Sequence, residues 1–411
     1  MDKKHIISVV AITDIFGEGQ KCTAVAIEYD VEIDETSLKT SDFVVDGRSI
    51  TDIYTNHTPV HGNHLFDTQA YPIVEKYGKF VILELDSSGD AGVTREMIGH
   101  GPHGRSVFHT ASVKVYQKGD IKTLVGEIYT AVDEVIISDK TKDLLADKFE
   151  ELSFDIPGTN KKMNYQLFIP EDYNSAEQYP MVLFIQDAGA CSDETIAPLA
   201  QGLGAVIWAT EEEQLKHKCF VIAPCYPTVC ANDYFEVTPE AEYTVELVKE
   251  ITRKYSIDEK RIYGTGQSMG CMMLCEINIR YPDLFGGCLL VAGQWNPETI
   301  SLCKDKNFWI IVSQGDEKAF PIMGACMESM EEAGGKVTRG TFNAKATDEE
   351  LKVAIDELES DGNNMYFTWF EGESIIPDGV TESHPGMHHV MTWARAYFIT
   401  GLRDWLFRQS L

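Results

Sequence analysis

From about residue 149 onward, runs of strand-forming residues alternate along the chain with runs that have helical periodicity. The strand-like runs are FEELSFDI, MNYQLFIP, MVLFIQD, CFVIAPCY, KRIYGTG, GCLLVAG, NFWIIVSQ and MYFTWFE. Helical runs include 239–255, where apolar residues recur every three or four positions, and a last helix over 391–407. Strands joined by helices pair in parallel, so the alternation predicts a mostly parallel sheet with helices on both faces. A ligand then binds in the loops at the carboxyl ends of the strands.

The first 140 residues have a different pattern, with short strand-like runs and no helical periodicity between them. These runs are HIISVVAI, TAVAIEYDVEI, SDFVVDG, SITDIYT, KFVILELD and SVFHTASVKVYQ. Evenly spaced short strands separated by turn residues are typical of an all-β sandwich. We therefore expect two domains, a β domain over 1–140 and a strand–helix domain over 149–411. Because the β domain precedes every strand of the second sheet, we expect it to take no part in chemistry at that sheet.

Gly266-Gln267-Ser268-Met269-Gly270 is a G-x-S-x-G motif between a strand-like run and an apolar helical run. A strand–turn–helix setting is what this motif needs in order to present a nucleophilic serine. Side chains at 266 and 270 would clash with the neighbouring strand and helix, which explains the two glycines. The backbone N–H of Met269, at the start of the helix, can donate to a developing oxyanion. The motif predicts Ser268 as the nucleophile of an acyl-transfer reaction.

A serine nucleophile needs a general base, and with this motif the histidine comes after the serine in the chain. Only His384, His388 and His389 follow Ser268, and all three precede the last predicted helix. His389 is favoured because it directly precedes that helix, which we expect to begin near Thr392. His388 and His384 are the alternatives.

The remaining parts of the site are expected in the loops after two other strands. After NFWIIVSQ the chain reads Gly315-Asp316-Glu317, and a carboxylate there can accept a hydrogen bond from the far imidazole nitrogen. Asp316 is favoured and Glu317 is the alternative. The second oxyanion donor is expected after MVLFIQD, as the N–H of Ala188 or Asp187.

These motifs resemble those of bacterial esterases that carry an N-terminal immunoglobulin-like domain ahead of an α/β-hydrolase domain, relatives of the polyhydroxybutyrate-depolymerase-like and "predicted peptidase" groups. The resemblance covers nearly the whole chain and implies an immunoglobulin-like β-sandwich followed by an α/β-hydrolase domain. It also implies a carboxylesterase that acts on short acyl or aryl esters, including esters that decorate plant polysaccharides. It rests on FGEGQKCTAVAIEYD, DFVVDGRSITDIYTN, QGLGAVIWA, CFVIAPCYP, DEKRIYGTGQSMG, LLVAGQWNP and HHVMTWARAY.

The resemblance also bears on single positions. Family members have the catalytic histidine three residues before a Ser or Thr and four before an aromatic residue, and His389 matches this spacing with Thr392 and Trp393. Many relatives have His-Gly where this chain has Gln186-Asp187, which leaves the second oxyanion donor open. Many also have a longer loop before the acid, which keeps Glu317 as an alternative.

Two residues after strand GCLLVAG, Gln294 and Trp295, are candidates for lining the substrate pocket. A position in the core is the alternative for Trp295. The predicted reaction is ester hydrolysis through an acyl-enzyme on Ser268, with no cofactor. A serine peptidase of the same fold and a non-catalytic glycan- or protein-binding protein are the competing interpretations.

The chain is strongly acidic, with 65 Asp and Glu against 35 Lys and Arg and a net charge of −30. This balance disfavours nucleic acid and anionic membrane surfaces as partners. We expect the partner to be a small-molecule or glycan-linked ester. The N-terminal run MDKKHIISVVAITD has no small-residue cleavage site and is a poor signal peptide, so we expect a cytoplasmic protein. A leader removed ahead of this sequence would mean secretion instead.

Cysteines and histidines could indicate disulfides or a metal. The ten cysteines contain no CxxC pair and several lie in apolar runs, which favours free, buried thiols, with Cys225 and Cys230 as the local pair that a disulfide would join. No cysteine or acidic pattern accompanies the clustered histidines of the β domain, so we interpret them as solvated loop residues and expect no metal. These are His57, His61, His64, His100 and His103.

Overall fold

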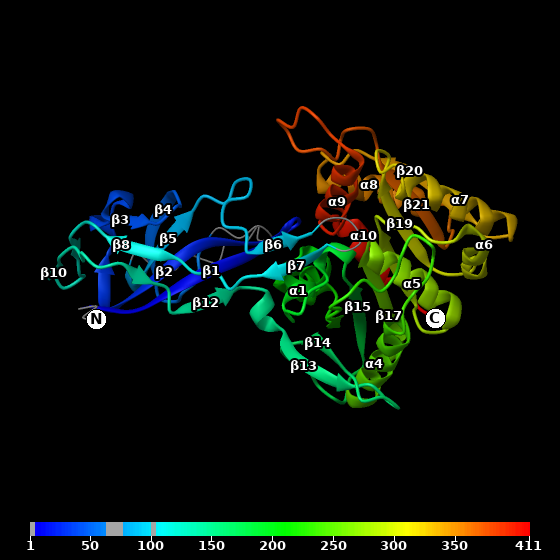
Figure 1. Cartoon of the computed structure of the whole chain (residues 1–411), viewed down its shortest axis with the longest axis horizontal. Coiled ribbons are helices and arrows are strands. Elements are labelled where there is room, and N and C mark those ends of the chain that lie inside the picture. The colour runs from blue at the N-terminus through cyan, green and yellow to red at the C-terminus, as the bar shows by residue number, and fades with distance from the viewer. Residues whose placement is uncertain (1–4, 63–76, 100–103) are drawn as a thin grey trace. The chain divides into compact units, whose positions relative to one another are not determined.

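The computed structural model describes residues 5–62, 77–99 and 104–411, which divide into two compact units (Figure 1). The first unit comprises 1–96 and 108–147, and the second comprises 97–107 and 148–411. The segment 97–107 therefore groups with the second unit, although its place in the sequence assigns it to the β domain. A single cut between residues 140 and 149 does not describe this segment.

The first unit is a sandwich of two sheets, as the strand pattern predicts. Its strands are Ile6–Phe16 (β1), Gly19–Asp34 (β2), Phe43–Val45 (β3), Ile50–Asn56 (β4), Tyr77–Leu85 (β5), Lys114–Gln117 (β8), Ile136–Ile137 (β11) and Lys140–Asp143 (β12). The larger sheet has the order β12-β1-β2-β5-β4 and the smaller has the order β11-β8-β3. Alternate residues such as Val9, Val25 and Leu83 of the larger sheet form one core with Phe43 and Val115 of the smaller.

Two pairs of short strands complete the β-rich region. Ile121–Lys122 (β9) pairs with Ile128–Tyr129 (β10), and Arg95–Ile98 (β6) pairs with Arg105–Phe108 (β7). Most of β7 belongs to the segment 97–107 and so to the second unit.

The second unit is built on a sheet of the order β13-β14-β16-β15-β17-β18-β19-β21-β20 in the described part of the chain. β13 and β14 pair antiparallel with their neighbours, and the pairs from β16 to β20 are parallel. The strands are Glu150–Asp155 (β13), Lys162–Phe168 (β14), Tyr179–Ile185 (β15), Phe220–Pro224 (β16), Ile257–Gln267 (β17), Gly287–Val291 (β18), Phe308–Ser313 (β19), Val337–Phe342 (β20) and Met365–Phe370 (β21).

Helices cover both faces of this sheet, as predicted. They are Ala197–Ala200 (α1), Leu203–Val206 (α2), Glu211–Lys216 (α3), Glu240–Lys254 (α4), Met269–Arg280 (α5), Pro297–Ile300 (α6), Ala319–Glu332 (α7), Asp348–Glu359 (α8), Pro385–Ala396 (α9) and Thr400–Phe407 (α10). On β15, Leu183 and Ile185 join the core formed with α4, α5 and α7, whereas the Phe184 ring lies 6.3 Å from that of Tyr397, just after α9. None of the helices in the described ranges is long and apolar enough to cross a lipid bilayer.

The prediction of one last helix over 391–407 is wrong. Two helices occupy this region, and the first begins at Pro385, with His384 as its N-cap. Proline is favoured at the first position of a helix, where its missing N–H costs no hydrogen bond. His388 and His389 consequently lie on α9 and not in the loop before it.

Candidate active site

The motif serine lies at a sharp turn between β17 and α5. Ser268 has a φ of 51° and a ψ of −114°, a region that non-glycine residues rarely occupy. The turn passes so close to β15 that a Cβ at Gly270 would lie 2.0 Å from the carbonyl oxygen of Ile185. A Cβ at Gly266 would lie 2.7 Å from the backbone of Gly270. The two glycines therefore let the chain hold Ser268 at the carboxyl end of the sheet.

Three of the predicted residues form a continuous chain of hydrogen bonds. The Nε2 atom of His389 lies 2.9 Å from the Oγ atom of Ser268, and the Nδ1 atom lies 2.5 Å from the Oδ2 atom of Asp316. These residues come from the loop after β17, the loop after β19 and helix α9. With Nδ1–H donating to the carboxylate, Nε2 is left as the acceptor that can take the serine proton.

Asp316 is held as an anion where it orients the histidine. Its side chain is 4% exposed, and its Oδ1 atom accepts hydrogen bonds from the N–H groups of Lys318 at 3.1 Å and Ala319 at 2.9 Å. Burial on its own raises the pKa of Asp316, but the hydrogen bond and charge of His389, with those two N–H groups, outweigh it and lower the pKa. The carboxylate can therefore stabilise a protonated imidazole.

The alternative residues lie elsewhere. His388 is buried, its Nδ1 atom is 3.0 Å from the Oγ atom of Ser313, and a Cβ at Gly315 would lie 2.4 Å from its ring. His384 accepts a hydrogen bond from the N–H of Met387 as the N-cap of α9. Glu317 is exposed, and its side chain has no hydrogen-bond partner in the described part of the chain. None of these three side chains is in the hydrogen-bond chain to Ser268.

Two backbone N–H groups are available for an oxyanion. Met269 is the first residue of α5, so its N–H has no partner within the helix. Ala188 begins the short turn Ala188–Ala190 after β15, and no acceptor for its N–H exists among the described residues. The N–H of Asp187, the other candidate, is engaged by the Oε1 atom of Gln201 at 3.2 Å. The geometry thus favours Ala188 over Asp187.

A buried polar network links the nucleophile turn to this second donor. The Nε2 atom of Gln267 donates to the Oδ2 atom of Asp187 at 3.2 Å and to the Oε1 atom of Gln201 at 3.3 Å. The Oδ1 atom of Asp187 accepts from the N–H of Ala190 at 3.1 Å, which closes the turn. Sequence reasoning did not identify Gln267 or Gln201, although Gln267 is the variable residue before the motif serine. The sequence feature that could have identified Gln267 is a long polar side chain directly before the predicted nucleophile.

The two candidates for the substrate pocket have other contacts. Trp295 is 1% exposed, belongs to the core of the second unit, and packs edge-on against Phe235 with ring centroids 5.9 Å apart. Gln294 donates to the Oδ1 atom of Asp233 at 3.1 Å, and Asp233 also pairs with Lys318. These contacts join the loops after β16, β18 and β19. A role for either residue in binding substrate stays a prediction.

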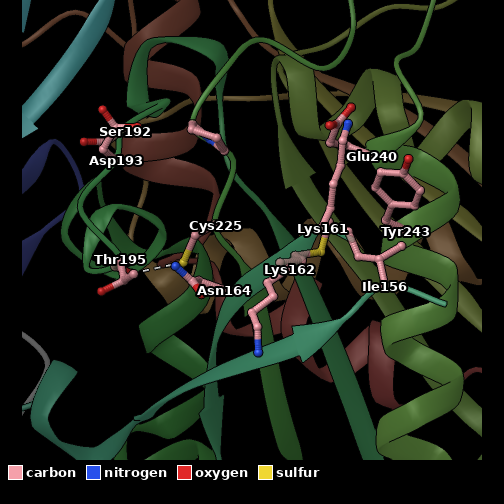
Figure 2. Close-up of a pocket in the computed structure, with 12 residues that line it drawn as sticks. Ile156, Lys161, Lys162, Asn164, Ser192, Asp193, Thr195, Cys225, Glu240 and Tyr243 are labelled. Carbon is pink, nitrogen blue, oxygen red and sulfur yellow. Dashed lines mark hydrogen bonds between the residues drawn. The ribbon is translucent and has the colours of Figure 1, made fainter. Parts of the chain in front are cut away.

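A cavity of about 440 Å³ lies at the far end of the loop that carries Ala188 (Figure 2). Its lining includes Ser192, Asp193 and Thr195 of this loop, together with Asn164 and Tyr243. None of Ser268, Asp316 and His389 lines it. The cavity is therefore separate from these three residues and does not define the position of a substrate.

Two further expectations concern cysteines and histidines. The ten cysteines are free and buried, Cys225 and Cys230 included, and burial raises the pKa of Cys191 to about 12. The interpretation of His61 as a solvated residue is wrong, because its side chain is 2% exposed and its Nε2 atom lies 2.6 Å from the Oδ2 atom of Asp14. His57 is exposed. The other three candidates, His64, His100 and His103, lie outside the described residues.

Comparison with known proteins agrees with this architecture. Residues 8–130 match the model of the esterase Ig-like N-terminal domain. A thermostable esterase of known structure aligns with 98% of this chain and 100% of its own, at 25% identity and a TM-score of 0.81. A feruloyl esterase module from Clostridium thermocellum aligns with 64% of this chain and 88% of its own (10% identity, TM-score 0.38). S-formylglutathione hydrolase from Staphylococcus aureus aligns with 63% of this chain and 98% of its own, at 15% identity and a TM-score of 0.36. No curated protein sequence matches the chain.

Proposed function

We propose that this chain, whose N-terminal domain belongs to the esterase Ig-like family, is a serine carboxylesterase that acts through an acyl-enzyme on Ser268. The observation that carries the proposal is the hydrogen-bond chain from Ser268 through His389 to Asp316. It ends on a nucleophile turn that the two flanking glycines make sterically feasible. The likeness to a thermostable esterase over nearly the whole length of both chains supports the same class of reaction.

In the proposed reaction, the Oγ atom of Ser268 attacks the carbonyl carbon of the ester while Nε2 of His389 takes the serine proton. The N–H groups of Met269 and Ala188 donate to the carbonyl oxygen as it becomes negative. His389 then gives its proton to the leaving alcohol, and the acyl group stays on Ser268. Water then attacks the acyl carbon while His389 takes a proton from it, and His389 returns that proton to the Oγ atom of Ser268 as the acid leaves. Asp316 keeps the Nδ1 proton in place throughout.

The proposed substrates are short acyl or aryl esters, either as free small molecules or attached to glycans. Support for this class comes from the resemblance to esterases with an immunoglobulin-like domain. An ester panel that varies the acyl group and the alcohol separately would define the preference.

Replacing Ser268 tests the proposal directly. Ser268→Ala removes the covalent route, so hydrolysis of p-nitrophenyl acetate should fall on the order of 10⁴-fold or more while the circular dichroism spectrum stays unchanged. An active-site phosphonate should label the wild type at Ser268 and should not label the variant. A folded variant that keeps a tenth of the wild-type rate would contradict the assignment. Faster cleavage of a peptide amide than of the matching ester would identify a peptidase instead.

A further inference from the structure

Ser106, on β7, is tied to the loop that carries the second oxyanion donor. Its Oγ atom donates to the carbonyl oxygen of Gly189 at 2.6 Å, and its N–H donates to the carbonyl oxygen of Cys191 at 3.0 Å. Its own carbonyl oxygen accepts a hydrogen bond from the Oγ atom of Ser192 at 2.8 Å. Ser106 is 1% exposed and Ser192 is 3% exposed, so these bonds have little competition from water.

These contacts are internal to the second unit. Ser106 falls in the segment 97–107, which groups with 148–411, although it also lies inside the range 8–130 that matches the Ig-like family model. The expectation that the N-terminal part of the chain takes no part in the site follows from its order in the sequence. The segment 97–107 is an exception, because it precedes the second unit in the sequence but groups with it in the structure.

The loop is anchored on both sides of Ala188. On one side, Asp187 is held by Gln267 and Gln201 through its carboxylate and its N–H. On the other side, Gly189 is held by Ser106. The direction of the Ala188 N–H is set by the peptide planes between these anchors, because a peptide unit is planar and turns as one body. The turn is also closed by the N–H groups of Ala190 and Cys191, so we expect release of the second anchor to loosen the direction of the Ala188 N–H without abolishing it.

We propose that Ser106 is a positioning residue for the oxyanion hole, acting through Gly189 on the N–H of Ala188. The proposal rests on the proposed esterase function and extends it to a residue that precedes the whole hydrolase domain in sequence. Removing an oxyanion donor costs about 10²–10³-fold in kcat in other serine hydrolases. Loosening one without removing it should cost less, about 10-fold.

The test compares three single variants of the full-length protein. Ser106→Ala removes the bond to Gly189. Ser192→Ala removes the bond to the carbonyl oxygen of Ser106, together with the contacts of the Ser192 hydroxyl with Glu194. Arg105→Ala is the matched control, since Arg105 lies on the same strand and its side chain pairs with exposed Asp193 at 3.3 Å. Kinetics with p-nitrophenyl acetate give kcat and KM. Binding of an alkyl boronic acid, which forms a tetrahedral adduct with the serine, reports the oxyanion hole separately from the substrate.

Ser106→Ala and Ser192→Ala should each lower kcat and the boronic acid affinity by similar factors, while KM and the melting temperature stay at the wild-type values. Arg105→Ala should match the wild type in all four measurements. If Ser106→Ala does not fold, the kcat and boronic acid affinity of Ser192→Ala decide whether the inference holds. Unchanged kcat and boronic acid affinity in the folded variants, or an equal fall in Arg105→Ala, would overturn the inference. A wild type with no Ser268-dependent ester hydrolysis would instead overturn the proposed function, and the inference with it.

Discussion

His388 and His389 are adjacent in the chain but lie in different surroundings. Successive residues of a helix point about 100° apart, so only one of the two can face Ser268. His389 takes that position, and His388 packs under Gly315 against Ser313. The sequence favours His389 through its place before the predicted last helix and through family resemblance; the first reason is wrong, because α9 begins at Pro385, whereas the helix geometry separates the two histidines directly.

This separation predicts opposite phenotypes for the two alanine variants. His389→Ala should lower kcat by about 10⁴-fold or more with little loss of stability, because the general base is removed. His388→Ala should keep most of the activity but lower the free energy of unfolding by about 1–3 kcal/mol, because the Ser313 hydroxyl loses its buried partner. Ester hydrolysis and urea unfolding of both variants would check this. A folded but inactive His388→Ala protein would show that the assignment of His389 as the general base is wrong.

The acid can be tested in the same way. Asp316→Asn keeps the size of the side chain but favours the wrong imidazole tautomer, a change that costs about 10⁴-fold in kcat in the serine protease triad. Glu317→Gln should leave kcat near the wild-type value, since Glu317 is exposed. Steady-state kinetics of both purified variants would decide. Equal and small losses would place the orienting acid elsewhere in the chain.

At the scale of helices and strands, the buried apolar strands were predictable from the sequence, whereas two less apolar elements were not. The buried strands β15, β18 and β19, and the buried part of β17 over 262–267, consist mostly of apolar or small residues, and each was identified. Strand β20 was missed because its sequence, VTRGTF, includes Arg339 and Gly340 and so lacks a continuous apolar run. It is the edge strand beyond β21, and an edge strand tolerates charged residues. The start of α9 was missed because its first turn, PGMH, offers no apolar periodicity.

One buried ion pair joins two helices that are far apart in the sequence. Arg403 of α10 donates to Glu213 of α3 at 2.7 Å and to the carbonyl oxygen of Tyr397 at 2.5 Å, and both charged side chains are at most 5% exposed. The sequence does not predict that either residue is buried, because each lies in a stretch with the pattern of an ordinary amphipathic helix. Burial is what makes the pair important.

Breaking this pair should therefore cost far more than breaking an exposed one. Arg403→Leu leaves Glu213 buried without its cation, and the free energy of unfolding should fall by about 3–5 kcal/mol. Arg408→Leu, which breaks the more exposed pair with Glu359 five residues further along the chain, should cost about 1 kcal/mol or less. Urea denaturation followed by tryptophan fluorescence would measure both. Equal losses would mean that Glu213 is hydrated or re-paired in the variant.

At the scale of the whole molecule, the order of the two domains follows from the sequence, but the grouping of 97–107 with the second unit does not. The change from strand-only to strand–helix rhythm near residue 149 matches the start of the nine-stranded sheet at β13. The assignment of 97–107 to the second unit depends on contacts such as Ser106 to Gly189, which are 83 positions apart. Local periodicity carries no information about pairs at that distance.

A truncated protein that begins at residue 148 should show this dependence. It retains Ser268, Asp316 and His389 but lacks Ser106, so its kcat on a small acetate ester should fall at least as far as in Ser106→Ala, with some activity left. Activity on bulky esters should change further. The comparison requires truncated protein that is soluble and folded by circular dichroism. Full activity on the small ester would show that the loop keeps its shape without β7.

The interleaving of the two units also sets an order of events on the ribosome. The first unit has all of its strands once residue 143 has emerged, since β12 is the last of them. Ser106 must then wait, because its partner Gly189 is made 83 residues after it. At about 5–20 residues per second, the delay is about 4–17 s. During that interval the Ser106 hydroxyl, which is buried in the finished protein, has no Gly189 to donate to, so a chaperone or protease that acts co-translationally meets Ser106 before this bond can form.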